Sequence, residues 1–177
     1  MDKETVQQKI LSKVIGFLSY RARTRKEIEL RLGRYFNSVK DIDEKTQQEI
    51  TQKIIEYLED NKLINDEEFI KLFIESKTRG KKALGKKAIE NKLIAKGINK
   101  EDAGQRTNAA IKEEDELKAA IGLIDKKFSS AIDAAKSLGK DYKSEEHIKD
   151  KMGRYLLSRG FSYSTSREAV DYLLKRP

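Results

Sequence analysis

The chain has 177 residues with no cysteine, no tryptophan and one histidine, and its 38 Lys and Arg against 30 Asp and Glu give a formal net charge of +8. This inventory excludes disulfides, thiolate nucleophiles and zinc sites built from Cys and His. Charged residues make up 38% of the chain and hydrophobic residues 37%, which predicts a modest core with large solvated surfaces.

Neither a membrane span nor a signal peptide is expected. No apolar run approaches the roughly 20 residues that a spanning helix needs, and the start MDKETVQQKI lacks a basic-then-apolar leader pattern. We therefore expect a cytoplasmic protein that does not enter the membrane. The one proline is Pro177, at the end of the sequence, so no helix in the body needs to be broken by proline, which favours an all-helical fold.

The first basic block runs from Lys13 to Lys40, with eight basic and two acidic residues. Within it, Thr24 followed by Glu27 has the spacing of a capping box, which predicts a helix start at this point. The arginines around this start, in YRARTRKE at 20–27, form the first of three basic turns.

An acidic block follows from Asp41 to Glu75, with eleven acidic and four basic residues. Asn65 with Glu68 predicts a second helix start. Apolar residues at helical spacing lie on either side of that start and predict two buried helix faces. The first face is Ile50, Ile54, Ile55 and Leu58, and the second is Phe69, Leu72 and Phe73.

The second basic block, Ser76 to Gly97, has eight basic residues and one acid and contains TRGKKALGKKAIENKL at 78–93. Gly80, Gly85 and Lys86 fall on positions of the phosphate-binding pattern G-x-x-x-x-G-K-[ST], but Lys87 stands where a hydroxyl should hold magnesium. A helical pattern precedes it instead of a buried strand, so nucleotide hydrolysis is rejected. We interpret the stretch as a basic turn between helices, whose backbone amides could meet a phosphate or a partner's carboxylate.

No arrangement of residues predicts catalysis, a metal or a cofactor. Glu113, Glu114, Asp115 and Glu116 are consecutive on a helix, so they point in different directions and predict a solvated face. His147 has no nucleophile or metal ligand at a recognisable spacing. Aromatic residues accompany the basic blocks, and both core packing, which is favoured, and stacking on nucleic-acid bases remain open for them. They are Tyr20, Tyr35, Tyr142, Tyr155, Phe161 and Tyr163.

An internal repeat organises the chain. KLIAKGINKEDA at 92–103 superposes on YLLSRGFSYSTS at 155–166, and RLGRYFNSVKDI at 31–42 is a weaker copy with Phe36 in the place of Gly97. Gly97 and Gly160 suit left-handed positions at helix ends. After a lead-in at 1–9 we predict three repeats of about three helices each, at 10–64, 65–128 and 129–177. Because one such repeat cannot bury its apolar faces alone, we expect an all-α, elongated, curved array.

Three ordered segments resemble the RecX family of recombinase regulators, and the resemblance covers nearly the whole chain. They are FLSYRARTRKEIELRL, then YLEDNKLINDEEFIKLFIESKTRGKKALGKKAIENKLIAKGI, then YLLSRGFSYSTSREAV. The middle segment is the most specific, because a leucine-containing helix ends in KLINDEEF and is followed by a basic, glycine-containing stretch and LIAKGI.

This resemblance implies a bacterial, cytoplasmic, non-enzymatic protein of tandem three-helix repeats that needs no cofactor. It implies binding to the RecA recombinase filament on single-stranded DNA, with modulation, mainly inhibition, of ATP hydrolysis, strand exchange and coprotease activity. A general helical-repeat nucleic-acid-binding protein is the alternative, and a scaffold without nucleic-acid contact is a third reading. A monomer is expected.

The contact candidates for the filament or its DNA are basic residues of the three basic turns, at 20–27, 77–87 and 151–159, together with Arg167. They are Arg21, Arg23, Arg25, Lys77, Arg79, Lys81, Lys82, Lys86, Lys87, Arg154, Arg159 and Arg167.

Overall fold

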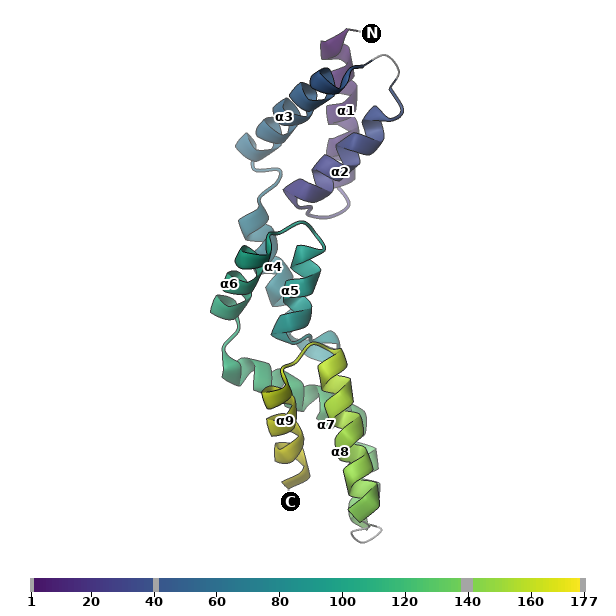
Figure 1. Cartoon of the computed structure of the whole chain (residues 1–177), viewed down its shortest axis with the longest axis vertical. Helices are drawn as coiled ribbons and strands as arrows, with labels where there is room; N and C mark the ends of the chain where they lie inside the picture. The colour runs from purple at the N-terminus through teal and green to yellow at the C-terminus, as the bar shows by residue number, and fades with distance from the viewer. Residues whose placement is uncertain (1, 40–41, 138–141, 176–177) are drawn as a thin grey trace. The chain divides into compact units, whose positions relative to one another are not determined.

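The computed structural model describes residues 2–39, 42–137 and 142–175, without the side chains at 81, 134–137 and 142–145. These residues form helices and no strand, so the prediction of an all-α fold is confirmed for them (Figure 1). The α-helices are α1 (Lys3–Leu18), α2 (Arg25–Phe36), α3 (Glu44–Asp60), α4 (Asp66–Thr78), α5 (Lys86–Ile94), α6 (Lys100–Ala110), α7 (Glu113–Ser137), α8 (Tyr142–Ser158) and α9 (Tyr163–Lys175), with a 3-10 turn η1 at Gly80–Lys82.

Side-chain caps begin the first four helices. Asp2 and Asp43 accept hydrogen bonds from the third backbone amide of α1 and α3. At α2 the predicted capping box is confirmed, because Thr24 and Glu27 each accept a hydrogen bond from the other's backbone amide. Asn65 accepts from the amide of Glu68 at 3.0 Å. Each bond satisfies a donor that a helix start leaves free, typically worth about 1 kcal/mol.

The helix ends also follow the sequence. Gly97 and Gly160 have φ of 89° and 82°, so both predicted left-handed positions are confirmed. In the first copy of the repeat the helix ends differently. Phe36 is buried and Asn37 closes α2 with a right-handed φ of −58°. The three copies therefore all mark the passage between two helices, namely α2 to α3, α5 to α6 and α8 to α9.

The chain divides into two compact units. Unit 1 comprises Met1–Ile70 with Ile94–Asn99, and unit 2 comprises Lys71–Leu93 with Lys100–Pro177. The predicted limits of three repeats, and their elongated, curved array, stay predictions. The limit predicted at residue 128 lies inside α7. The repeats are aligned on the glycines at their helix ends, and no comparable signal in the sequence marks the residue at which the next helix begins.

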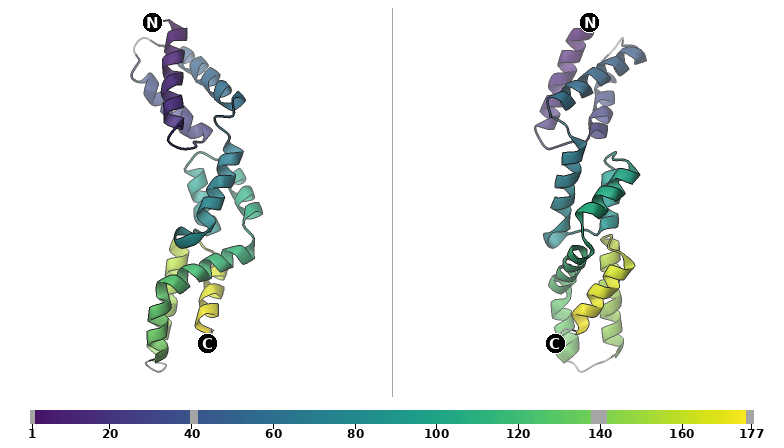
Figure 2. Two further views of the ribbon diagram at one scale, coloured as in Figure 1. Left: turned by 180° about the vertical axis from the view of Figure 1, so that it is seen from behind. Right: turned by 90° about the vertical axis from the view of Figure 1, so that its left-hand side faces the viewer.

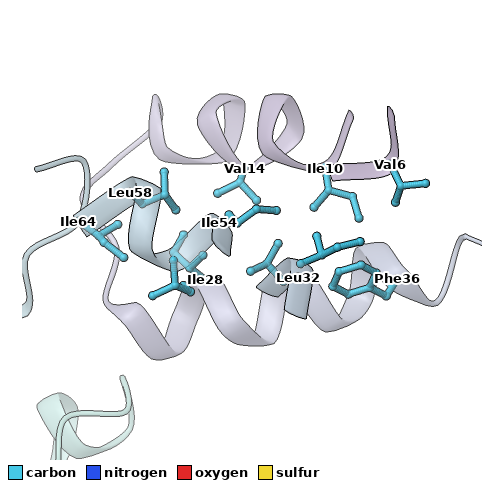
Figure 3. Close-up of a cluster of buried hydrophobic side chains, with 11 residues drawn as sticks. Val6, Ile10, Val14, Ile28, Leu32, Phe36, Ile54, Leu58 and Ile64 are labelled. Atoms are coloured by element: carbon cyan, nitrogen blue, oxygen red, sulfur yellow. The ribbon is translucent and has the colours of Figure 1, made fainter. Parts of the chain in front are cut away.

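Unit 1 has its core between α1, α2 and α3. Figure 3 shows apolar side chains of the three helices pointing toward one another. Ile28, Leu32, Ile50 and Leu58 are fully buried, and burial of each such side chain contributes roughly 1.5–3 kcal/mol. The predicted face of α3 is therefore confirmed.

Unit 2 has its core between α7, α8 and α9, which lie side by side in both views of Figure 2. Ile124, Met152 and Leu156 are fully buried there, and Ala83, from the turn after η1, is 1% exposed within the same core. The basic turn before α5 is thus attached to the core of unit 2 by an apolar residue in its middle.

The predicted apolar face of α4 needs correction. Phe69 is buried as predicted, but Leu72 is 51% exposed, whereas Ile70 and Ile74 are buried. The buried face of α4 is therefore rotated relative to the predicted face. Ile70 and Ile74 are four positions apart and so also share one face of the helix, and this pair packs inward.

Candidate functional site

The basic turn before α5 is closed by backbone hydrogen bonds and does not have the form of a phosphate loop. Gly80 has φ of 79° and its carbonyl accepts from the amide of Ala83 at 3.1 Å, while the amide of Leu84 donates to the carbonyl of Lys77 at 2.8 Å. Helix α4 precedes the turn, where a phosphate loop would follow a strand. The rejection of a nucleotide-binding loop agrees with this geometry.

Gly85 is glycine because its backbone touches another backbone. A Cβ at Gly85 would overlap the carbonyl oxygen of Gly160 and the amide nitrogen of Phe161. The amide of Gly85 donates to the carbonyl of Arg159 at 3.0 Å, and a Cβ at Gly160 would in turn overlap Ala88. We call this contact, between the start of α5 and the turn after α8, the glycine junction. It accounts for the glycine that resembled a phosphate-loop residue.

The acidic run at the start of α7 contributes to the same place. Glu113, Glu114 and Asp115 are exposed, as predicted for a solvated face, but for Glu116 that prediction is wrong. Glu116 is 6% exposed and accepts the amide of Lys86 at 2.9 Å. Its carboxylate thereby satisfies a free donor at the start of α5.

Two backbone amides of this turn are therefore not available to a ligand. The amides of Gly85 and Lys86, which open α5, donate to Arg159 and Glu116. The expectation that such amides meet a phosphate or a partner's carboxylate is wrong for these two, because groups from α7 and α8 already occupy them. The side chains of this turn could hold an anion in place of these two amides.

Exposed cations are among those side chains. Arg79, Lys82 and Lys87 are exposed, and within the described part of the chain no carboxylate pairs with them. The side chain of Lys81 lies outside the described residues. We call the cations of this turn the basic turn cluster; its members are Lys77, Arg79, Lys81, Lys82, Lys86, Lys87 and Arg159.

Two cations of this cluster lie on aromatic rings. The Lys77 ammonium is 5.5 Å from the ring centroid of Phe73, and the Arg159 guanidinium is 5.3 Å from that of Tyr155. Lys127 lies 3.9 Å from the same Tyr155 ring. Lys127 could not be predicted as a member of this group, because it sits in the middle of α7, 28 residues before Tyr155 in the sequence, and no local pattern links the two.

The same junction geometry recurs in unit 1. The Thr24 hydroxyl donates to the carbonyl of Lys96 at 2.6 Å, and the amide of Arg25 donates to Asp66 at 2.8 Å. A Cβ at Gly97 would overlap the side chain of Lys26. In both units a helix start thus receives the glycine turn of a later helix and a carboxylate from the beginning of another. We call this contact the Thr24 junction.

Glu27 holds the Thr24 junction together electrostatically. Its carboxylate accepts hydrogen bonds from Arg21 at 2.6 Å and Lys96 at 3.3 Å and from the amide of Thr24. Burial acts to raise the pKa of Glu27, but these hydrogen bonds outweigh it and lower the pKa from 4.5 to about 2. Glu27 therefore stays ionised throughout the physiological range.

The three arginines predicted as contacts in unit 1 are not equivalent. Arg21 is paired with Glu27, and Arg25 is paired with Glu29 at 3.2 Å and with Glu59 at 3.0 Å. Arg23 has no such pair among the described residues and lies 3.9 Å from the Phe17 ring centroid. The structure thus separates one uncompensated cation from two that already have carboxylate partners.

The predicted contact residues of α8 and α9 also differ in whether a carboxylate pairs with them. Arg154 is exposed and donates only to the carbonyl of Asp150, at 3.4 Å. Arg167 lies 3.8 Å from Asp171, which also pairs with Lys149 at 3.2 Å. Arg167 borders an open hollow of about 580 Å³ on the outer side of α9, beside two exposed tyrosines, Tyr163 and Tyr172.

Aromatic residues of the basic blocks lie partly in the core and partly on the surface, and base stacking stays a prediction for the exposed ones. Phe161 is buried in the core of unit 2, and Tyr35 and Tyr155 are half-buried under cations. Tyr20 and Tyr163 are 84% and 72% exposed, so core packing does not apply to them. The side chain of Tyr142 lies outside the described residues.

The described residues contain no group of side chains that could bind a metal ion. His147 is exposed on α8, and no three His, Cys, Asp or Glu residues in the described ranges could share a metal ion. None of the helices that the structure describes combines the length and the apolar character needed to cross a membrane.

Two known proteins to which this chain is similar carry the same name. The chain is 29% identical over 162 residues, 92% of its length, to "Regulatory protein RecX" of Lactococcus lactis subsp. cremoris strain MG1363, and 28% identical over 176 residues to the same-named protein of Prosthecochloris aestuarii, covering 94% of this chain and 95% of that one. The chain spans about half the length of the Lactococcus relatives, 54%. No family model matches.

Solved structures show the same fold. The crystal structure of RecX from Lactobacillus salivarius matches with a TM-score of 0.72 at 24% identity, over 96% of this chain and 97% of that one. A second crystal structure, of "regulatory protein RecX", matches with a TM-score of 0.69 at 22% identity, over 94% of this chain and 73% of that one. The sequence relatives are named as regulatory proteins and not as enzymes. The resemblance carried by the three ordered sequence segments is thereby confirmed: the chain is similar in sequence and in fold to RecX regulatory proteins over more than nine tenths of its length.

Proposed function

We propose that this protein regulates the RecA recombinase by binding its filament on single-stranded DNA. In this proposal it acts in the cytoplasm as a monomer, without a cofactor, and mainly inhibits ATP hydrolysis, strand exchange and coprotease activity. The proposal rests on similarity to RecX regulatory proteins for the partner and on the basic turn cluster for the contact.

The observation that supports the contact is the combination of free charge and fixed backbone at the basic turn. Arg79, Lys82 and Lys87 have no carboxylate partner among the described residues, while the glycine junction and Glu116 hold the backbone that carries them. Because the backbone that carries these cations is already held in place, binding has to order only their side chains, and less of the interaction energy is lost to ordering the chain. The partner surface would be anionic, either acidic side chains of the filament or phosphates of its DNA.

Titration of the recombinase's ATP hydrolysis on single-stranded DNA tests the proposal. The wild-type protein should reduce hydrolysis clearly below one molecule per recombinase subunit. A variant in which Arg79, Lys81, Lys82 and Lys87 are changed to Glu should need at least about tenfold more protein for the same effect, because each reversed charge turns attraction into repulsion. Lys86 is left unchanged because its amide is bonded to Glu116.

A matched variant controls for net charge. Lys45, Lys53, Lys71 and Lys118 are exposed and lie outside the basic turns, so changing all four to Glu alters the net charge equally. This control should inhibit like the wild type. Equal activity of both variants would point to a scaffold without charge-dependent contact, and no effect of the wild type at severalfold excess would refute regulation of the filament. In that case the general nucleic-acid-binding alternative would be left.

A further inference from the structure

A row of stacked cations and rings crosses α1, α2 and the loop between them. The Arg23 guanidinium lies 3.9 Å from the ring centroid of Phe17, and the Arg31 guanidinium lies 4.9 Å from the same centroid. Arg31 is also 4.9 Å from the ring centroid of Tyr35, which carries Lys13 at 5.5 Å. We call these three cations and two rings the α1–α2 ladder.

The cations of the ladder have no ion-pair partner among the described residues of unit 1. Among the residues that the structure describes, no carboxylate pairs with Lys13, Arg23 or Arg31, although Arg21, close by in sequence, has one. The Nε atoms of Arg23 and Arg31 are buried without a hydrogen-bond partner in the described structure. Burial, followed by the charge of Arg21, lowers the pKa of Arg23, with Glu27 acting in the opposite direction. Three cations held together in this way attract an anion strongly.

The form of the ladder favours phosphate as that anion. A guanidinium stacked on a ring keeps its N–H edge free, and this planar edge matches the oxygens of a phosphate or carboxylate. A stable contact with another protein usually centres on apolar anchors and is depleted of charge. Here cations already cover the apolar rings, so the surface can form charged contacts but has no free apolar anchor.

The rings also decide what the ladder does not recognise. Proteins that hold bases of single strands use exposed aromatic faces as stacking platforms. Phe17 and Tyr35 are each half-buried and each carry two cations, so neither presents a free platform. We propose that the α1–α2 ladder binds the phosphate backbone of single-stranded nucleic acid without reading its bases. This site requires no recombinase and so goes beyond the proposed regulatory function.

Fluorescence anisotropy with a labelled single-stranded oligothymidylate, measured over a range of salt concentrations, tests the site without recombinase. Arg23 and Arg31 are changed together to Gln, and the matched control changes the exposed Lys45 and Lys53 of α3 to Gln. The ladder variant should bind at least about tenfold more weakly at low salt, and its slope of log affinity against log salt should fall by about 1.4, because two phosphate contacts are lost. The control should bind like the wild type.

A third variant and a set of competition experiments distinguish the possible outcomes. Lys13→Gln, at an exposed position, should weaken binding of the oligothymidylate about threefold. If circular dichroism shows that the double variant is unfolded, this single variant tests the ladder in its place. An abasic oligomer of equal length should compete as well as the oligothymidylate. The inference would be overturned if the wild type did not bind, or if the ladder variant and the control lost the same affinity. It would also be overturned if polyglutamate competed as strongly as the abasic oligomer, because the ligand of the ladder would then be an acidic protein segment. Preference for the base-containing strand would overturn the absence of base reading.

Discussion

Replacement of Gly85 by alanine should lower the free energy of unfolding of unit 2 by about 3 kcal/mol or more. The new Cβ would overlap the backbone of Gly160 and Phe161, and backbone atoms cannot rotate away as a flexible side chain can. The start of α5 would have to move off the turn after α8, and the hydrogen bond from Gly85 to Arg159 would be lost as well. Thermal denaturation followed by circular dichroism should show a melting temperature lower by roughly 10 °C.

Gly122→Ala is the matched control. Gly122 lies inside α7 with no atom near the position of an added Cβ, so alanine there should stabilise the helix by about 0.4–1 kcal/mol. Gly160→Ala should also destabilise, because it breaks the same contact and occupies a φ of 82°. Because both changes break one junction, the double variant Gly85→Ala/Gly160→Ala should lose clearly less than the two single losses added together. A Gly85→Ala protein that melts with the wild type would contradict the glycine junction.

Local signals in the sequence predicted the elements of the fold well. The capping box of Thr24 and Glu27 and the helix-ending glycines Gly97 and Gly160 involve residues a few positions apart, so their chemistry can be read directly. The period of α3 was equally clear, because its apolar residues leave one choice of face. On α4 two overlapping faces were possible, and only packing against the rest of the fold selected Ile70 and Ile74 over Leu72.

The candidate site was harder to predict, because its partners lie far apart in the sequence. Nothing local distinguishes Arg23, which stacks on Phe17, from Arg25, whose partner Glu59 is 34 residues away. Glu116 looked like any residue of a solvated acidic run, yet it is 30 residues from the amide that it satisfies. Charge blocks therefore located the basic surfaces, but only the fold could tell which cations already have partners.

Neutralisation of Glu27 should lower the free energy of unfolding of unit 1 by about 3 kcal/mol at pH 7. The pKa of Glu27 is about 2 in the folded protein against an ordinary 4.5, and this difference corresponds to about 3 kcal/mol. Because the folded-state pKa is depressed, the stabilisation is complete above pH 4.5 and is lost as the pH falls toward 2. Glu27→Gln removes the charge and keeps an oxygen that can still accept from the amide of Thr24.

Urea denaturation of wild type and Glu27→Gln between pH 7 and pH 2 measures this contribution, and hydrogen exchange of residues 21–36 assigns the loss to unit 1. The difference between the two proteins should be constant down to about pH 5 and should vanish near pH 2. Glu59→Gln removes an equal charge from the exposed pair with Arg25 and should cost less than about 1 kcal/mol. A Glu27→Gln difference that does not change with pH would show that the Arg21 and Lys96 contacts do not stabilise the Thr24 junction through charge.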